Sequence, residues 1–269
     1  MWRGVCAKAF SESDFKVRER LMVVAGFYTD GQYLKNNPGW HLDAALWKAN
    51  AIRRMLQRNH IHPQTVCDVG CGVGEILRLL QQDLEPTSTL LGYDIAPYAI
   101  EKAKTQENER LHFKLGDFLE EEKGHFDLLL MIGVLEHFEN LFQVLRDIKE
   151  KSEYKMFLLP LDLTLTTVIR NRVINFRHEA GHLHFFTKDV ILAIFKDLGY
   201  EVIDYFYVLQ PLDTTPWSEV KRKPLRLLRK LAKVTILGLQ RLPSLVLYAV
   251  HKDLAARMFA SWRLMVLVK

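Results

Sequence analysis

Cysteine is scarce in this chain of 269 residues, which contains only Cys6, Cys67 and Cys71. An odd number of cysteines without a paired C-x-x-C spacing indicates neither a disulfide framework nor a zinc ribbon. Such a composition is typical of proteins in a reducing compartment. We therefore expect a cytoplasmic location and no bound metal.

Long apolar runs are also absent. No stretch of 18 or more apolar residues occurs, so a membrane-spanning helix is not expected. Residues 1–14 carry four charged side chains and no continuous apolar segment, unlike a secretory signal. The chain has no internal repeat and no low-complexity tract, and 49% of its residues are hydrophobic. This composition predicts a globular protein with a sizeable core.

Negative charge is scarce in one segment only. The net charge is +5, but residues 213–260 hold ten Lys/Arg against three Asp/Glu, which leaves the rest of the chain near −2. The basic balance therefore describes one segment, and a nucleic-acid partner is not expected. Within it, residues 217–241 form an amphipathic basic pattern with three open interpretations. The segment could lie on an anionic membrane surface, line a pocket for an acidic substrate, or cover the core with a solvated charged face.

From Thr65 to Val208 the chain alternates short apolar runs with helix-period segments, the pattern of βαβ units around a largely parallel sheet. The predicted strands are Thr65–Val69, Leu90–Asp94, Leu111–Leu115, Phe126–Met131, Lys155–Leu159 and Glu201–Val208. The predicted helices between them are Glu75–Gln82, Pro97–Thr105, Phe138–Lys151 and Lys188–Leu198. Pro97 suits a first helical turn and Gly199 a helix stop.

The segments outside this alternation complete the predicted organisation. Asp14–Asn59 has a mostly helical pattern, and Trp262–Lys269 is short, apolar and strand-like. If the last segment pairs with the main sheet, the basic region before it becomes an insertion. We predict a helical cap over 1–60, an α/β core over 61–210, a basic helical insertion over 211–260, and the final strand of the core sheet over 261–269.

The strongest local feature is a glycine-rich turn between a predicted strand and a predicted helix. Val66–Leu77 reads V-C-D-V-G-C-G-V-G-E-I-L. Glycine is needed where a turn is tight or a ligand approaches the backbone closely, and the start of the following helix favours an anionic group. Asp94 ends the next apolar run, where an acid commonly binds the ribose hydroxyls of a nucleotide-like cofactor. The order of these features predicts a cofactor site.

NAD is the alternative cofactor for this turn. The dinucleotide fingerprint spaces its glycines G-x-G-x-x-G, whereas the spacing here is G-x-G-x-G and Glu75 occupies the place of the last glycine. Glu75 would add bulk and negative charge beside a pyrophosphate. The spacing therefore favours a cofactor other than NAD.

Asp68–Gly74 resembles motif I of the class I S-adenosylmethionine-dependent methyltransferases, in particular the broad group that includes the ubiquinone and menaquinone methyltransferases. Further matches follow in order at Tyr93–Ile95, Gly116–Phe118, Phe126–Leu130, Val134–His137 and Gly181–Thr187. The resemblance covers about residues 40–210. It implies a Rossmann-like three-layer α/β sandwich with a seven-stranded, mostly parallel sheet whose last strand is antiparallel.

The resemblance also implies S-adenosylmethionine as cofactor and S-adenosylhomocysteine as product. The cofactor-binding residues that it implies are Asp68, Gly70, Cys71, Gly72, Gly74, Asp94, Ile95, Asp117, Phe118, Ile132 and Val134. The glycines would face the methionine part, which Asp68 would orient, and Asp94 would hold the ribose. Ile95, Asp117 with the adjacent Phe118, and residues 132–134 would surround the adenine. Taken singly, Asp117 could instead be a helix cap and Asp94 a solvated strand-end acid.

The sulfonium already activates the methyl group, so the protein has mainly to align the acceptor and exclude water. A general base is needed only for an acceptor with a high pKa, and histidine suits that role near neutral pH. The candidates are His182, our first choice, and His137; each could equally be structural. Segments that could shape the acceptor pocket include Tyr33, Trp40, His41 and His184.

His178–His182 matches the H-E-x-x-H pattern of zinc proteases. That mechanism requires both histidines on one face of a regular helix. Gly181 lies inside the expected helix and Leu183–Thr187 does not continue it. We therefore do not expect a metalloprotease.

The predicted function is methyl transfer from S-adenosylmethionine to a small molecule, at oxygen rather than at nitrogen or carbon. The fourth strand is followed neither by an Asp/Asn-Pro-Pro-Tyr motif nor by Pro-Cys, which disfavours methylation of nucleic-acid bases. Two alternatives stay open: methylation of RNA or protein, supported only by the basic insertion, and a non-catalytic S-adenosylmethionine-binding protein.

Overall fold

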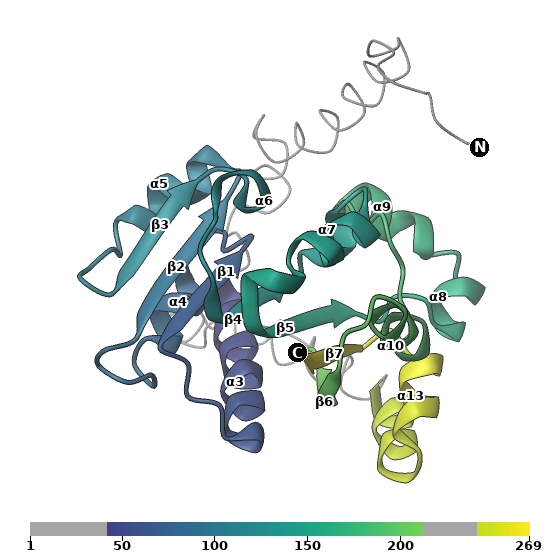
Figure 1. Cartoon of the computed structure of the whole chain (residues 1–269). Helices are drawn as coiled ribbons and strands as arrows, with labels where there is room; N and C mark the ends of the chain where they lie inside the picture. The colour runs from purple at the N-terminus through teal and green to yellow at the C-terminus, as the bar shows by residue number, and fades with distance from the viewer. Residues whose placement is uncertain (1–41, 212–240) are drawn as a thin grey trace, which may run out of the picture.

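The computed structural model describes residues 42–211 and 241–269, which fold around one seven-stranded sheet (Figure 1). The strand order is β3-β2-β1-β4-β5-β7-β6. The strands are β1 Thr65–Val69, β2 Thr89–Asp94, β3 Leu111–Leu115, β4 Phe126–Ile132, β5 Ser152–Pro160, β6 Val202–Leu209 and β7 Trp262–Val268. This arrangement confirms the predicted sheet, including its final strand at the end of the sequence.

The direction of the strands changes only around β7. β1 to β5 pair in parallel with their neighbours, and β7 runs antiparallel to both β5 and β6. Leu158 on β5 faces Met265 on β7, which in turn faces Phe206 on β6. Because β7 lies between two strands that precede it in sequence, the core sheet is complete only when the last residues of the chain are in place.

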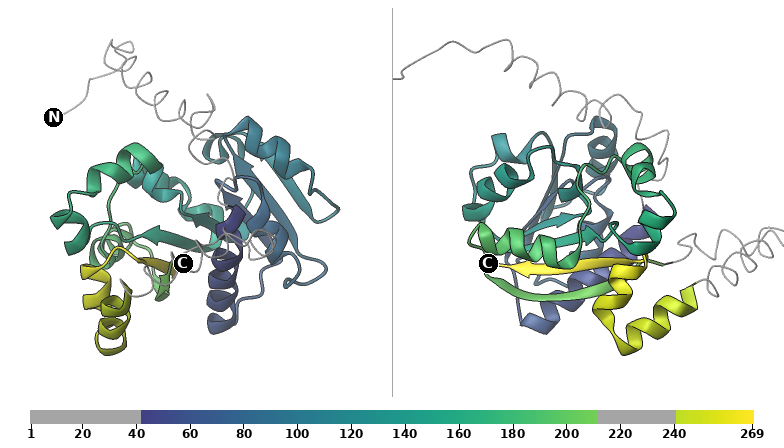
Figure 2. Two further views of the ribbon diagram at one scale, coloured as in Figure 1. Left: turned by 180° about the vertical axis from the view of Figure 1, so that it is seen from behind. Right: turned by 90° about the vertical axis from the view of Figure 1, so that its right-hand side faces the viewer.

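Helices cover both faces of the sheet (Figure 2). One face packs against α3 Leu42–Asn59, α4 Glu75–Leu80 and α5 Pro97–Lys104, and the other against α7 Leu141–Asp147, α10 Lys188–Asp197 and α13 Lys252–Met258. Successive residues of a strand point to opposite faces, so Val66 joins the first core and Cys67 the second. The result is the predicted three-layer sandwich.

The remaining described elements are short. They are α6 Phe118–Glu121, α8 Leu165–Ile169, α9 Val173–Ala180 and the 3₁₀ turns Leu135–His137 and Lys149–Lys151. Residues 241–250 are also helical, and in the described part of the chain no helix is both long and apolar enough to cross a membrane. Of the predicted insertion, residues 241–250 and Lys252–Met258 are helical, whereas 212–240 lie outside the described residues. Of the predicted N-terminal cap, only the residues from 42 onward are described.

One predicted helix is wrong in extent. The sequence pattern predicts a helix over Phe138–Lys151, but α7 spans only Leu141–Asp147. The side chain of Asn140 accepts a hydrogen bond from the backbone N–H of Gln143 and so starts the helix late. After Ile148 the chain tightens into a 3₁₀ turn that leads directly into β5. The other predicted helices begin at the expected residues and end within two residues of the expected ends.

Candidate active site

The predicted site residues gather at the carboxyl edge of the parallel strands. The glycine loop follows β1, Asp94 ends β2, and the turn at residues 133–137 follows β4. β1 lies between β2 and β4, so the chain moves outward in opposite directions from this point of the sheet. Open α/β sheets bind ligands at such a switch point.

The glycine loop is tied to the second strand by hydrogen bonds. The backbone N–H groups of Gly70 and Cys71 donate to the carbonyl oxygen of Tyr93 at 2.8 and 3.0 Å. The N–H of Gly72 donates to the Asp94 carboxylate at 2.8 Å. Gly70, Gly72 and Gly74 all have positive φ, at 75°, 56° and 79°, which glycine adopts without steric cost. The loop is therefore held in one conformation beside Asp94.

Two of these glycines serve packing rather than an open cradle. A Cβ on Gly74 would lie 2.4 Å from the ring of Phe113, and one on Gly70 would lie 2.6 Å from Val134. The resemblance to the class I methyltransferases predicts that all three glycines face the methionine part of the cofactor. At Gly70 and Gly74, however, the Cβ direction points at neighbouring side chains. Because Gly70 and Gly74 lack a Cβ atom, β3 and the turn after β4 can pack closely against the loop.

Asp68 is a buried carboxyl group directly before the loop. Its residue is 1% exposed, and its Oδ1 has no hydrogen-bond partner among the residues that the structure describes. Burial raises the pKa of this carboxyl to about 8, with a smaller rise from the negative charge of Asp94 and an opposing effect of Lys48. An unpartnered buried oxygen is costly. It fits a ligand with a cationic donor, such as the α-ammonium of S-adenosylmethionine.

Asp94 and Asp117 are held by backbone groups at the ends of the next two strands. Asp94 Oδ1 accepts a bond from the Ala96 N–H at 2.9 Å, and burial raises its pKa while these backbone bonds oppose the rise. Asp117 Oδ1 accepts from Leu119 N–H at 2.8 Å, so this residue is indeed the cap of α6. A carboxylate has about four acceptor positions, so both groups can also accept bonds from a ligand. Beside them, Ile95 is 39% exposed and presents an apolar side chain at the same edge.

The other predicted cofactor residues lie deeper. Phe118 is 1% exposed, with its ring edge-on to Tyr93 at a centroid distance of 5.5 Å. Its ring therefore belongs to the core beneath the site and does not face the space above it. Cys71 and Ile132 are also buried, and burial raises the pKa of the Cys71 thiol far above its ordinary value. These side chains form the floor of the site.

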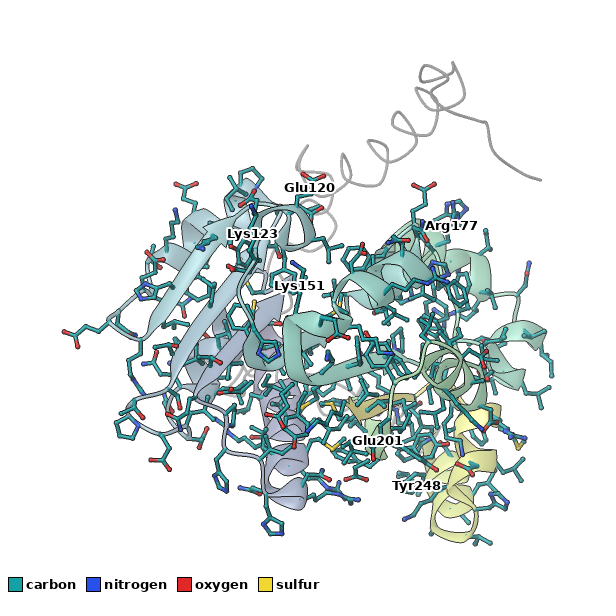
Figure 3. The ribbon with its side chains drawn as sticks, viewed as in Figure 1. Glu120, Lys123, Lys151, Arg177, Glu201 and Tyr248 are labelled. Atoms are coloured by element: carbon teal, nitrogen blue, oxygen red, sulfur yellow. The ribbon has the colours of Figure 1, made fainter. Side chains whose placement is uncertain are left out.

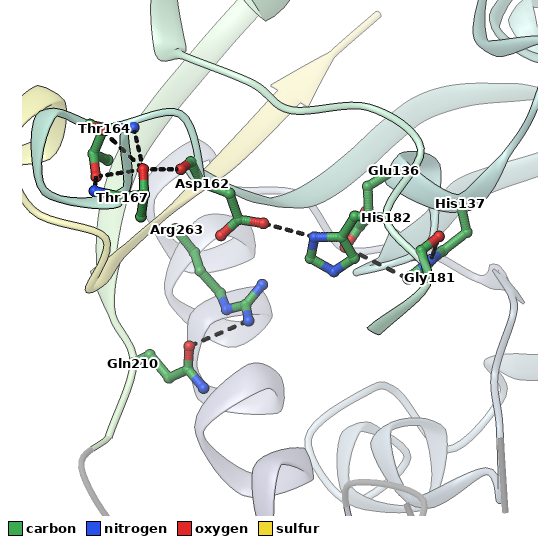
Figure 4. Close-up of polar contacts among 9 residues, drawn as sticks. All are labelled: Glu136, His137, Asp162, Thr164, Thr167, Gly181, His182, Gln210 and Arg263. Atoms are coloured by element: carbon green, nitrogen blue, oxygen red, sulfur yellow. Dashed lines mark hydrogen bonds and ion pairs between the residues drawn. The ribbon is translucent and has the colours of Figure 1, made fainter. Parts of the chain in front are cut away.

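Histidines and carboxylates meet beside the loop, at the ends of β4 and β5 (Figure 4). We call Glu136, His137, Asp162 and His182 the Glu136 cluster. His182 Nδ1 lies 2.6 Å from Asp162 Oδ2, and His137 Nδ1 lies 3.1 Å from the carbonyl oxygen of Gly181. The two imidazole rings are 5.1 Å apart between centroids. The structure thus brings together the two histidines that the sequence analysis selects as catalytic candidates.

Glu136 and Asp162 are functional candidates that the sequence analysis does not select. Glu136 is 1% exposed, and its Oε2 has no hydrogen-bond partner among the described residues. Asp162 follows β5 directly, and its carbonyl oxygen accepts a bond from the Thr167 hydroxyl at 2.6 Å. The only available sequence signal is position, because an acid after a parallel strand falls at the ligand-binding edge.

Burial lowers the pKa of His137, although the nearby charge of Glu136 and the hydrogen bond to Gly181 oppose this effect. The neutral imidazole, which keeps a lone pair, is therefore favoured near neutral pH. His184 lies outside the cluster: its Nε2 is 2.8 Å from the carbonyl oxygen of Phe138. His184 thus anchors the segment that carries His182. Tyr33, Trp40 and His41, the remaining predicted acceptor-side residues, lie outside the described residues.

The structure excludes the zinc-protease arrangement of His178–His182. α9 ends at Ala180, and Gly181 adopts a left-handed conformation with φ 79°. His178 is exposed on the helix, whereas His182 is buried after the helix end. The two histidines therefore do not share a helix face.

A separate cavity lies at the opposite edge of the sheet. It is lined by residues of α3, by residues 60–63 before β1, and by residues 80–85 before β2. These segments lie at the amino ends of the strands. The cavity contains none of the predicted site residues.

Comparisons with known proteins agree with this arrangement. The sequence profile of a family described as a methyltransferase domain matches residues 40–205. Malonyl-[acyl-carrier protein] O-methyltransferase of Anoxybacillus flavithermus is 43% identical over 60 residues. That match covers 21% of this chain, and the chain spans only 23% of the length of this curated relative.

Several solved structures share the fold at low sequence identity. The plantazolicin methyltransferase in complex with a substrate analogue and S-adenosylhomocysteine superposes with a TM-score of 0.56 at 15% identity, covering 96% of this chain and 97% of its own. Magnesium protoporphyrin IX methyltransferase from Synechocystis PCC 6803, with bound S-adenosylhomocysteine, gives 0.53 at 15% identity over 71% and 93%. At these identities the likeness shows the fold.

Proposed function

The chain belongs to the methyltransferase-domain family over residues 40–205, and on this premise we propose that it methylates an oxygen atom of a small organic acceptor. S-adenosylmethionine is the methyl donor. The observation that carries the proposal is the buried, unpartnered Oδ1 of Asp68 beside the glycine loop. This oxygen matches the α-ammonium that distinguishes this donor from a nicotinamide dinucleotide.

The donor would lie across the carboxyl ends of β1, β2 and β3. We assign the ammonium to Asp68, the ribose hydroxyls to Asp94 and the adenine amine to Asp117, with the exposed side chain of Ile95 against the adenine. Glu75, in the first turn of α4, occupies the place of the last glycine of the dinucleotide fingerprint and forms an ion pair with Arg78 at 2.6 Å. Its bulk at this position supports the donor over NAD.

The Glu136 cluster marks the side of the acceptor. It lies at the ends of β4 and β5, next to β1 on the side away from Asp94. In the reaction an acceptor oxygen attacks the methyl carbon, the carbon–sulfur bond breaks with its electron pair on sulfur, and S-adenosylhomocysteine leaves as a neutral thioether. A hydroxyl acceptor must also release its proton. We propose that His137 and His182 activate the acceptor for this step.

A small acceptor is supported by what similar proteins are named for. The curated relative is an O-methyltransferase of malonyl-[acyl-carrier protein]. Two proteins of the same fold act, by their names, on magnesium protoporphyrin IX and plantazolicin. These names support a small acceptor for this chain, and the panel of acceptors described below tests it.

We also propose peripheral contact with an anionic membrane through residues 217–241, of which 217–240 lie outside the described residues. The helix that follows supports the idea, because Leu242, Val246 and Val250 are exposed at a spacing of four residues. A basic segment next to an exposed apolar stripe suits a lipid surface.

The function is tested by binding and then by turnover. Titration calorimetry should detect S-adenosylhomocysteine binding to the full chain, and Asp94→Ala should weaken it about tenfold or more through the lost ribose hydrogen bonds. Methyl transfer from labelled S-adenosylmethionine is then measured with a panel of hydroxyl and carboxyl acceptors. His182→Ala should lower turnover by about 100-fold or more while it leaves S-adenosylhomocysteine binding intact. His178→Ala, an exposed histidine outside the cluster, is the matched control.

Each alternative has its own outcome. RNA-dependent stimulation of turnover would favour a nucleic-acid substrate, and donor binding without transfer to any acceptor would favour a non-catalytic role. If a nicotinamide nucleotide gives heat and S-adenosylhomocysteine gives none, the proposed function is wrong.

A further inference from the structure

The strongest unassigned feature of the molecule is the donor set inside the Glu136 cluster. Glu136, His137 and His182 each offer one ligand atom, and these atoms all lie within 4.8 Å of one another. Two imidazoles and one carboxylate form a donor set typical of first-row divalent metals. We propose that the Glu136 cluster binds a divalent cation of the Zn²⁺ or Mn²⁺ class.

Hydrogen bonds fix the tautomers of both histidines. The carbonyl oxygen of Gly181 can only accept, so His137 Nδ1, 3.1 Å away, carries the proton. The Asp162 carboxylate likewise accepts from His182 Nδ1 at 2.6 Å. In this tautomer the lone pair that a metal would bind lies on Nε2 of each ring. Metal-binding histidines are typically held by a carboxylate or a backbone carbonyl in this way.

Glu136 supplies the negative charge that such a site needs. Its residue is 1% exposed, and Oε2 has no hydrogen-bond partner among the described residues. A buried carboxylate oxygen without a partner costs free energy, which a bound cation would recover. His137 Nε2 already lies 3.9 Å from Glu136 Oε1. Ligand atoms around tetrahedral zinc are separated by about 3.3 Å, given bonds of about 2.0 Å, so the three ligand atoms, which lie within 4.8 Å of one another, would move closer together when the ion binds.

Two oriented histidines point to a metal rather than to a general base. Proton removal requires one lone pair on one oriented ring. Here both rings are oriented and both lie next to the same carboxylate, an arrangement that proton transfer does not require. Three protein ligands also leave coordination positions open for an acceptor oxygen.

Lys48 is the competing partner for Glu136. A Cβ on Gly133 would lie 3.6 Å from Glu136 Oε1 and 3.7 Å from Lys48 Nζ, so the ammonium is close to the cluster. If Lys48 alone balanced Glu136, the cluster would bind no metal. The orphaned Oε2 and the two oriented rings favour the cation.

The role of the metal in catalysis rests on the proposed function. A hydroxyl acceptor bound to the cation would lose its proton to water more readily, because the positive charge lowers its pKa. The resulting oxygen anion would attack the methyl carbon as described above. His137 and His182 would thus activate the acceptor as ligands, and Asp162 would act as a positioning residue for His182.

The test uses the full chain after treatment with a chelator and removal of the chelator. Calorimetric titration with Zn²⁺, and Mn²⁺ binding followed by electron paramagnetic resonance, should each give one ion per chain. Glu136→Gln and His182→Ala should abolish the site, and Asp162→Asn should weaken metal binding about 10–100-fold. His178→Ala should bind as the wild type does. Zn²⁺ should also raise the melting temperature of the wild type but not of His182→Ala.

The two proposals fail separately. Glu136, Asp162 and His182 are not among the residues proposed to bind S-adenosylmethionine. Binding of S-adenosylhomocysteine therefore shows whether each variant is folded. The metal site is wrong if the wild type binds no ion, or if Glu136→Gln and His182→Ala bind as tightly as the wild type. Metal binding without S-adenosylhomocysteine binding would instead contradict the proposed function.

Discussion

Buried carboxyl groups dominate the site at the scale of single residues. Among the described residues, neither Asp68 Oδ1 nor Glu136 Oε2 has a hydrogen-bond partner; Asp68 lies on β1, and Glu136 lies in the turn that follows the neighbouring strand β4. Unsatisfied buried polar atoms are rare in folded proteins, and each one requires a physical explanation, such as a ligand that binds there. Each of these atoms fits a cationic partner, which implies that ligand binding stabilises this edge of the molecule.

Asp68 makes donor binding depend on pH. Its pKa is raised from its ordinary value to about 8, so the native protein holds a proton there that the unfolded chain releases above pH ~4. The proton held by Asp68 in the native protein therefore makes folding stability fall as the pH rises from about 4 to about 8. An ammonium-bearing ligand favours the ionised carboxylate. The affinity for S-adenosylhomocysteine should rise up to about tenfold per pH unit between about pH 6 and pH 8.

Calorimetry at several pH values, repeated in buffers of different ionisation enthalpy, measures this effect and should detect release of a proton on binding. Asp68→Asn should bind more weakly and show a flatter pH profile. An unchanged profile in this variant would mean that another group controls the pH dependence.

Sequence reasoning identified single site residues but not their partners. His137 and His182 were predictable as candidates because they follow apolar strands. The bond from His182 to Asp162 was not, since it joins residues 20 positions apart that are separated by α8 and α9, and the path of these helices depends on the fold. The resemblance implies Phe118 as the neighbour of the adenine-binding Asp117, and its side chain is buried in the core.

At the scale of elements, strands were more predictable than the turns that follow them. The bounds of β1 and β3 agree with the predicted runs, although β1 is buried at four of its five residues and β3, at the edge of the sheet, buries only Leu111 and Phe113. The helix predicted over Phe138–Lys151 is shorter because Asn140 provides a cap inside the apolar pattern. The capping residue Asn140, rather than the periodicity of the apolar residues, thus determines where this helix begins.

The turn into α4 should be the least tolerant of added atoms. Gly74 has φ 79°, and an added Cβ would lie 2.4 Å from the Phe113 ring. Gly74→Ala should reduce the free energy of unfolding by about 2–4 kcal/mol, the sum of backbone strain and overpacking. Urea denaturation gives this value.

Gly199→Ala is the matched control. Gly199 also has positive φ, at 75°, but a Cβ there would meet only the terminal Nζ of the Lys149 side chain, at 2.9 Å. This substitution should cost about 1–2 kcal/mol from backbone strain alone. In a double-mutant cycle, Phe113→Leu should recover part of the free energy of unfolding that Gly74→Ala loses. Equal losses of unfolding free energy in Gly74→Ala and Gly199→Ala would show that backbone strain, and not packing against Phe113, determines the loss at Gly74.

At the scale of the whole molecule, the C-terminal region joins the core to the basic segment. The helix at 241–250 packs against β7 through one face: Trp262 Nε1 donates to the Ser244 hydroxyl at 2.9 Å, and the Tyr248 ring stacks on Trp262 at 4.0 Å. Figure 3 labels Tyr248 on this helix. The opposite face carries Val246 and Val250, which are 64% and 83% exposed. The apolar stripe is therefore held outward by a fixed helix.

This arrangement predicts binding to anionic vesicles. Residues 213–260 carry a net charge of +7, and each basic residue near an anionic surface contributes about 1 kcal/mol. The full chain should co-sediment with phosphatidylcholine vesicles that contain about a third phosphatidylserine, and less at high salt because the charges are screened. Val246→Ser with Val250→Ser should weaken binding about tenfold or more, since burial of each valine contributes about 1.5 kcal/mol.

Leu115→Ser provides the control, because Leu115 is an exposed aliphatic residue on β3, at the other end of the sheet. It should leave vesicle binding unchanged. The paired valine variant should keep its unfolding free energy, since Ser244 and Tyr248 still hold the helix on β7. Equal binding to neutral vesicles would refute the electrostatic part of the argument. Equal binding by the valine variant would show that the stripe does not enter the lipid and that the charged segment acts alone.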